Sequence, residues 1–263
     1  TAIDVLDNAE KINAEVRSGA AQIAISSPEA LIVNAYRGGS FRMLASVAQK
    51  PPHYIVAKPA IKSLADLRGA RFGVLSMNEG TTFLVDDLAR AAGLNKGDYE
   101  IAAVGGAPTR WKLLQDGKID AALQPFPLSY ESDAAGFSNL GPIAAYVPDY
   151  EFTVVFGDAA WAKTNASLVT SYLRALRRGQ AFMSSNPDET TAIAARELRT
   201  SPALAARALA DSAHIGIIPE SLSVSEKGLA RVFSTLQRAG LVAASEPYDR
   251  GKFVDDSYLA QAK

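Results

Sequence analysis

Four short turns in the sequence join small polar residues to the predicted start of a helix, a pattern that suits the binding of an anion. Exposed backbone N–H groups and the helix dipole both favour a negative group at a helix N-terminus. Glycine lets the backbone approach a ligand closely, and serine or threonine adds a hydroxyl that can donate a hydrogen bond. The turns are Ser26-Ser27-Pro28, Ser76–Thr82, Gly105–Thr109 and Gln124–Pro127. Each turn could also be a helix cap alone, since serine and threonine are standard capping residues.

Glu79 stands inside the second of these turns and complicates the anion hypothesis. Its carboxylate puts a negative charge in the loop where an anion would bind. The sequence leaves two alternatives open: Glu79 faces solvent, or it holds a cationic or hydrogen-bond-donating group of the ligand.

The turns are positioned by an alternation of strands and helices along the first part of the chain. Short apolar strands such as AQIAIS, RFGVL and IDAAL are each followed by a predicted helix. This order predicts an α/β fold with mainly parallel sheets flanked by helices. Ligands of such folds bind beyond the carboxyl ends of the strands, so we expect the turns to lie along such an edge.

The remainder of the chain, after FTVVFG, is predicted to be helix after helix. Ser223 with Glu226 predicts an N-terminal capping box for a helix that stops at Gly240. These are structural signals, and they carry no chemistry.

Composition excludes several classes of site. The chain of 263 residues has no cysteine, which excludes disulfides, thiolate nucleophiles and cysteine metal ligands. The net charge of −1 gives no bulk attraction to nucleic acid or to an acidic membrane. No apolar run is long enough to span a bilayer, and the first residues lack the features of a signal peptide. An export signal, if the protein has one, would lie upstream of this sequence.

Four segments carry a resemblance to a known family: GAAQIAISSPEALIVNAYRGG, KSLADLRGARFGVLSMNEGTT, VGGAPTRWKLLQDGKIDAALQPFP and FVDDSYLAQA. They resemble the NMT1/THI5-like group of ABC-importer solute-binding proteins, which includes alkanesulfonate, taurine, nitrate and thiamine-precursor binders. The resemblance implies a two-lobe type II periplasmic binding protein fold with a ligand cleft between the lobes and no catalysis. Lobe one would comprise residues 1–58 plus 153–263, and lobe two residues 59–152. A hinge motion would close the lobes over the ligand.

The resemblance also implies a set of ligand-binding residues. They are Ser26, Ser27 and Pro28 in lobe one, Asn78, Gly80, Thr81 and Thr82 in lobe two, and Gln124, Pro125 and Phe126 on the floor of the cleft. Further candidates are His53, Gly106, Arg110 and Tyr130. Arg110 could clamp a carboxylate or sulfonate, or it could face solvent. The aromatic rings near the lobe-two loops could stack on a planar ligand or pack within the lobe.

The resemblance further implies the ligand, the partner and the location. We expect a small organic anion, such as a sulfonate or an aromatic carboxylate, and neither a metal nor a cofactor. The expected partner is an ABC permease in the membrane, with no nucleic-acid partner, and we expect a monomer. The location would be periplasmic, or lipid-anchored outside the inner membrane.

Two alternatives and one departure accompany this prediction. A thiamine-pyrimidine precursor binding or biosynthesis protein has the same fold, but its synthases are associated with a cysteine-rich motif that this chain lacks. An effector-sensing domain would carry a basic helix-turn-helix, which is also missing. Relatives begin with a strand and loop that precede the helix DVLDNAEKINAEVRSG. We therefore expect the first strand unit of lobe one to be absent from this chain.

Overall fold

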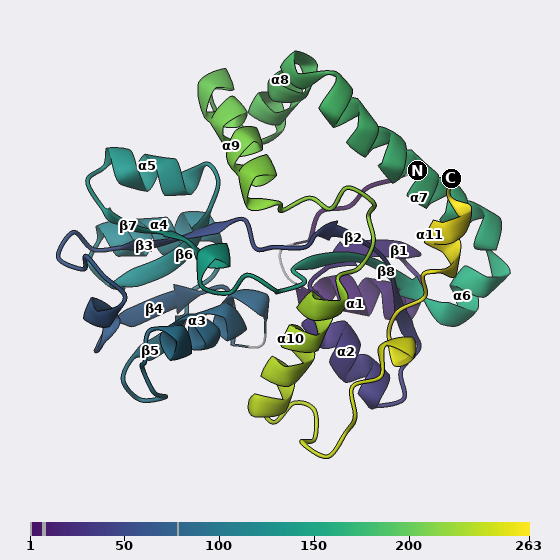
Figure 1. Cartoon of the computed structure of the whole chain (residues 1–263), viewed down its shortest axis with the longest axis horizontal. Helices are drawn as coiled ribbons and strands as arrows, with labels where there is room; N and C mark the ends of the chain where they lie inside the picture. Colours follow the sequence, from purple (N-terminus) through teal and green to yellow (C-terminus); the bar gives the residue numbers. More distant parts are fainter. Residues whose placement is uncertain (1, 7–8, 78) are drawn as a thin grey trace. The chain divides into compact units, whose positions relative to one another are not determined.

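The computed structural model describes residues 2–6, 9–77 and 79–263, which divide into two compact units (Figure 1). Unit 1 comprises Thr1–Lys50, Asp149–Pro187 and Gly216–Lys263, and unit 2 comprises Pro51–Pro148 and Asp188–Ile215. The resemblance assigns Asp188–Ile215 to lobe one, whereas the contacts of the structure group this segment with unit 2. The boundaries of the closing lobes stay a prediction.

Unit 1 is built on a three-stranded antiparallel sheet in the order β1-β8-β2. The strands are β1 (Ile23–Ser26), β2 (Phe41–Ala48) and β8 (Thr153–Asp158). Residues 154–156 of the central strand β8 are fully buried, as expected for a strand that is covered on both faces. The predicted absence of a strand unit from lobe one stays a prediction.

Helices of unit 1 cover this sheet. They are α1 (Ala9–Ser18), α2 (Glu29–Tyr36), α6 (Ala159–Thr164), α7 (Ala166–Ser185), α10 (Glu226–Arg238), η3 (Arg250–Lys252) and α11 (Ser257–Gln261). One core cluster joins Val169 and Leu173 of α7 and Leu259 of α11 to Leu44 and Val155 of the sheet. Burying each such aliphatic side chain contributes about 1.5–3 kcal/mol to folding.

Unit 2 contains a five-stranded mixed sheet in the order β5-β4-β6-β3-β7. The strands are β3 (His53–Ala57), β4 (Arg71–Val74), β5 (Glu100–Ala103), β6 (Ala121–Pro125) and β7 (Ser138–Pro142). β4 pairs in parallel with β5 and β6, whereas β3 pairs antiparallel with β6 and β7.

The α/β fold class is confirmed, but the predicted mainly parallel pairing holds only for β5-β4-β6. Two strands joined by a helical crossover run in the same direction. The alternation of strands and helices in the sequence therefore predicts parallel pairs, but it does not show which other strands join the sheet. In unit 1, β1 and β2 are joined by α2 and do run in the same direction. β8 lies between them and pairs antiparallel with both, because it enters the unit from unit 2 and not through a crossover within the sheet.

Helices of unit 2 flank its sheet, and Figure 1 shows α3 and α5 on opposite sides of the strands. They are η1 (Ala65–Leu67), α3 (Gly80–Ala91), α4 (Ala107–Gln115), α5 (Leu128–Ala134), η2 (Ile143–Ala145), α8 (Pro187–Glu197) and α9 (Pro202–Ile215). Leu114 of α4 packs with Ile119, Val56 and Ala122 in one core cluster. Within the described residues, no helix combines the length and the apolarity that crossing a membrane requires.

Candidate functional site

The carboxyl ends of the parallel strands in unit 2 gather most of the predicted ligand-binding residues at one edge of the sheet. β4, β5 and β6 run in the same direction and end at Val74, Ala103 and Pro125. β3 runs the opposite way, and His53 at its start pairs with Pro125. The predicted residues at this edge, or in the loops that leave it, are His53, Gly80, Thr81, Thr82, Gly106, Arg110, Gln124, Pro125 and Phe126.

The N-terminus of α3 is tied down by groups of its own loop. Thr81 Oγ1 donates a hydrogen bond to the carboxylate of Glu79, the residue that precedes α3. Thr82 Oγ1 donates to the carbonyl of Ser76 at 2.6 Å. Thr81 and Thr82 are only 5% and 4% exposed. Both hydroxyls therefore fix the loop, and Asn78, which was also predicted, lies outside the described residues.

Glu79 and Arg110 are oppositely charged groups that interact at this edge. Burial raises the pKa of Glu79, while the Thr81 hydroxyl and the positive charge of Arg110 oppose that rise. Arg110 is 4% exposed, and its Nη1 and Nη2 donate to the carbonyls of Gly105 and Leu123, each at 3.1 Å. Burial lowers the pKa of Arg110, and the charge of Glu79 raises it. The guanidinium is therefore a buried charge held by the backbone, and the solvent-facing alternative for Arg110 is wrong.

Gln124 and Ser129 are fully buried polar side chains near the end of β6. Among the described residues, both amide atoms of Gln124 lack a hydrogen-bond partner, and so does the hydroxyl of Ser129. Arg110 Nε also lacks one there. A buried polar group without a partner costs roughly 1–3 kcal/mol. Gln124 stands out because its amide offers both a donor and an acceptor.

His53 is neutral at physiological pH. Burial and the positive charge of Arg110 lower the pKa of His53 to about 3. The imidazole therefore contributes hydrogen-bonding capacity to this edge and no positive charge for an anion.

The predicted aromatic residues of unit 2 pack against one another and against α9. The rings of Phe126 and Tyr130 stack with centroids 5.3 Å apart, and Tyr54 lies 5.5 Å from Phe126. Asp211 of α9 accepts hydrogen bonds from the hydroxyls of Tyr130 at 2.7 Å and Tyr54 at 3.3 Å. The Arg207 guanidinium lies over the Tyr130 ring at 3.9 Å, a cation–π contact. The alternative of packing within the protein therefore holds for the Tyr130 ring, which is 3% exposed.

Asp211→Asn is expected to loosen α9 from Tyr54 and Tyr130 within unit 2. An amide accepts hydrogen bonds less strongly than a carboxylate, and hydrogen bonds to charged groups contribute about 1.5–3 kcal/mol. Hydrogen exchange should therefore accelerate in the peptide covering Pro202–Ile215, and Tyr130→Phe should produce a similar acceleration. Glu197→Gln, at the exposed end of α8, serves as the control. Unchanged protection of α9 in both Asp211→Asn and Tyr130→Phe would contradict this role.

In unit 1, the predicted turn Ser26-Ser27-Pro28 joins β1 to α2. Ser26 is 6% exposed, and its hydroxyl has no hydrogen-bond partner among the described residues. Glu29 in the first turn of α2 is buried and accepts a hydrogen bond from the Tyr150 hydroxyl at 2.7 Å. An acidic side chain in the first turn is favoured by the helix dipole, and Glu29 places one at the start of α2.

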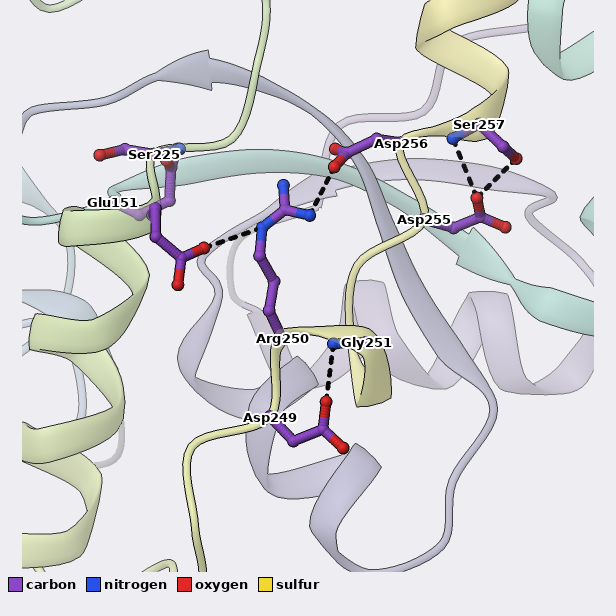
Figure 2. Close-up of polar contacts among 9 residues, drawn as sticks. Glu151, Ser225, Asp249, Arg250, Gly251, Asp255, Asp256 and Ser257 are labelled. Carbon is purple, nitrogen blue, oxygen red and sulfur yellow. Dashed lines mark hydrogen bonds and ion pairs between the residues drawn. The ribbon is translucent and has the colours of Figure 1, made fainter.

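Glu151 is a fully buried carboxyl in unit 1 that the sequence analysis missed. It accepts hydrogen bonds from Ser46 Oγ at 2.5 Å and from the Ser225 amide at 2.7 Å. Burial raises the pKa of Glu151 to about 7, although these hydrogen bonds and the charge of Arg250 act against the rise. Figure 2 shows Arg250 in this region, where its guanidinium also pairs with Asp256 at 2.5 Å.

Sequence signals for the missed carboxylates are weak. Glu29 could have been found from its place in a helix's first turn, where acidic residues are favoured. Glu151 and Asp211 have no such signal, because their hydrogen-bond partners are distant in the sequence. Ser46 lies 105 residues from Glu151, and Tyr130 lies 81 residues from Asp211. Among the described residues, no group of three or more histidine, cysteine or acidic side chains is placed to hold a metal ion.

Comparison with known proteins identifies the family. The family model described as NMT1/THI5 like matches residues 2–190, which is more than half of the chain. The chain belongs to the NMT1/THI5-like family. No curated protein sequence matches it. The resemblance seen in the sequence is therefore confirmed at the level of the family.

Solved structures share the fold of this NMT1/THI5-like chain at low sequence identity. The ligand-binding component of an ABC-type import system from Staphylococcus aureus, with zinc bound, has a TM-score of 0.80 and 12% identity, over 98% of this chain and 86% of that chain. The periplasmic aliphatic sulphonate binding protein SsuA from Escherichia coli has a TM-score of 0.69 and 18% identity, over 92% and 78%. The desulfurization enzyme DSZB has a TM-score of 0.65 and 15% identity, over 91% and 84%. These likenesses confirm the periplasmic binding protein fold.

Proposed function

We propose that this protein is the solute-binding component of an ABC importer and binds a small organic acid without catalysis. The observation that carries the proposal is the match to the NMT1/THI5-like family over residues 2–190. Structural neighbours named as an ABC-import ligand-binding component and as a sulphonate-binding protein support it. The proposal includes an ABC permease as partner and a location outside the inner membrane.

The proposed ligand contacts in unit 2 are the loops at the carboxyl edge of its sheet, and in unit 1 the turn that precedes α2. Both places follow the rule that ligands of α/β sheets bind beyond strand ends and near helix N-termini. The helix dipole interaction contributes only about 0.3–1 kcal/mol. Micromolar binding, about −8 kcal/mol, therefore needs several polar groups together with apolar burial.

A thermal-shift screen followed by isothermal titration calorimetry tests the proposal. The probes are alkanesulfonates, aromatic carboxylates and pyrimidines, each added to the whole chain. We expect at least one class to raise the melting temperature and to bind with a dissociation constant in the micromolar range or below. Failure of all three classes, under conditions where an SsuA protein responds to alkanesulfonates, would contradict the proposed function.

Catalysis is the second candidate function, because the desulfurization enzyme DSZB shares the fold. The absence of cysteine from the chain excludes a thiolate nucleophile, but it does not exclude other chemistry. Incubation of any ligand found in the screen, followed by mass spectrometry, separates the candidates. Recovery of the unchanged ligand supports binding alone, whereas a product that requires the protein would establish an enzyme.

A further inference from the structure

Arg207 of α9 carries a guanidinium whose flat face is held in place while the side chain stays exposed. The guanidinium carbon lies 3.9 Å from the centroid of the Tyr130 ring, and this cation–π contact occupies one face of the group. The Arg207 side chain is nevertheless 52% exposed. A guanidinium stacks through its face, whereas its N–H donors point outward in its plane. The contact with Tyr130 therefore leaves these donors to other partners.

Asp211 is the acidic neighbour of Arg207, but it is committed mainly to two tyrosines. Asp211 Oδ2 lies 3.9 Å from Arg207 Nε, beyond the usual hydrogen-bond length of about 2.7–3.2 Å. The same oxygen accepts hydrogen bonds from the hydroxyls of Tyr130 at 2.7 Å and Tyr54 at 3.3 Å. Asp211 thus fixes the two tyrosines against α9, and the N–H donors of Arg207 can receive a second acid.

Tyr130 places Arg207 close to the carboxyl edge of the unit 2 sheet. The Tyr130 ring is 3% exposed and stacks on the Phe126 ring with centroids 5.3 Å apart. Phe126 directly follows Pro125, the last residue of β6. Ligands of α/β folds bind beyond such strand ends, so the guanidinium lies near the place where a ligand is expected.

Arg110, the arginine that the sequence analysis named for this role, is badly placed to clamp an acid. It is 4% exposed, and its Nη1 and Nη2 donate to the carbonyls of Gly105 and Leu123. A ligand would have to break both hydrogen bonds to form a bidentate pair with this guanidinium. The exposed guanidinium of Arg207 is therefore the better partner for a carboxylate or sulfonate.

We propose that Arg207 binds the acidic group of the ligand and determines the preference for acids over neutral molecules. Its planar fork matches two oxygens of a carboxylate or sulfonate in a bidentate pair. Tyr130 holds the guanidinium before the ligand arrives, so little side-chain freedom is lost on binding. This inference rests on the proposed function, since it names the residue that gives the solute-binding protein its preference for organic acids.

Matched pairs of an acid and its neutral amide test the inference in calorimetric titrations of the whole chain. The pairs are benzoate with benzamide and ethanesulfonate with ethanesulfonamide, and any further acid from the screen is paired with its own amide. We expect the unaltered chain to bind at least one acid about tenfold or more tightly than its amide, because only the acid forms a charge-assisted pair with Arg207. An amide that binds too weakly for direct titration is measured by competition against its acid.

Arg207→Gln assigns this preference to its residue. The substitution removes the charge and the planar fork, so the acid should lose about tenfold or more in affinity while the amide changes by about threefold or less. Arg207→Lys keeps the charge without the fork, and its affinity for the acid should lie between those of the unaltered chain and Arg207→Gln. Arg196→Gln, at an exposed arginine of α8 in the same unit, is the matched control and should keep the unaltered preference.

Two results would overturn the inference and leave the proposed function standing. An equal loss of acid and amide binding in Arg207→Gln would show that Arg207 only holds α9 in place. An unchanged affinity for the acid in the folded variant would show that Arg207 does not bind the acidic group. If no acid binds the unaltered chain, the proposed function fails and the inference fails with it.

Discussion

Gly228→Ala is expected to destabilise the protein, whereas Gly179→Ala, made in another helix of the same unit, is expected to stabilise it. A Cβ at Gly228 in α10 would lie 2.6 Å from the backbone nitrogen of Glu151 and 3.1 Å from its Cα. Those atoms belong to the backbone, so relief requires α10 to shift away from the segment that it packs against. Forced overpacking of this kind typically costs about 1–3 kcal/mol, which outweighs the gain of up to about 1 kcal/mol in helix propensity.

Gly179→Ala measures the effect of helix propensity on stability without the overpacking expected at Gly228. A Cβ at Gly179 meets no atom within 4 Å, and the residue lies in the interior of α7. Replacing glycine by alanine should therefore raise the free energy of unfolding by about 0.5–1 kcal/mol. Urea titrations of the two variants should move the unfolding midpoint in opposite directions. Shifts of the same sign would show that the close approach of α10 to Glu151 does not govern the stability of unit 1.

Local rules predicted the helix stops well, because a stop depends on one residue. Gly240 was expected to end a helix, and it has a positive φ of 71° just beyond α10. Gly93 and Gly117 have the same φ just beyond α3 and α4. That conformation costs a residue with a side chain about 1–2 kcal/mol, so glycine marks the place without help from distant parts of the chain.

The start of α10 was less predictable, because other polar partners, near and distant in the sequence, compete for the capping residues. The predicted capping box of Ser223 and Glu226 is wrong: α10 begins at Glu226, and Ser225 is the N-cap that accepts from the Gly228 amide. Glu226 pairs with Arg250 at 3.1 Å, and Ser223 Oγ lies 2.7 Å from Ser221 Oγ. The spacing alone gave no sign of either partner.

The chemistry of the candidate site was the least predictable part. The sequence correctly indicated which loops follow the strands β4, β5 and β6, because the order of strands and helices determines the edge at which they emerge. It did not indicate that Arg110 is buried against the backbone, nor that Gln124 is fully enclosed. Those outcomes depend on which groups face each side chain across the sheet, and pairing between distant strands decides that.

Glu151→Gln is expected to abolish a pH dependence of stability in the neutral range. Burial raises the pKa of Glu151 from about 4.5 to about 7, so the folded protein binds this proton more tightly than the unfolded chain does. The contribution of the protonated group is complete below about pH 4.5 and is lost as the pH rises through about 7. The difference of about 2.5 between these pKa values corresponds to about 3–4 kcal/mol, because one pKa unit is worth 1.36 kcal/mol. Wild-type stability should therefore fall, relative to the variant, between pH 5 and pH 8.

Urea unfolding of the wild type and of Glu151→Gln at several pH values between 5 and 8 measures this difference. Glutamine keeps an oxygen to accept the Ser225 amide and is neutral at every pH, so it imitates the protonated carboxyl. At pH 5 the two proteins should be of similar stability, and at pH 8 the variant should be the more stable. Glu220→Gln, an exposed site in the same unit, is the control and should follow the wild type across the range. A difference between wild type and Glu151→Gln that stays constant from pH 5 to 8 would mean that Arg250 and the two hydrogen bonds fully offset the cost of burying the charge.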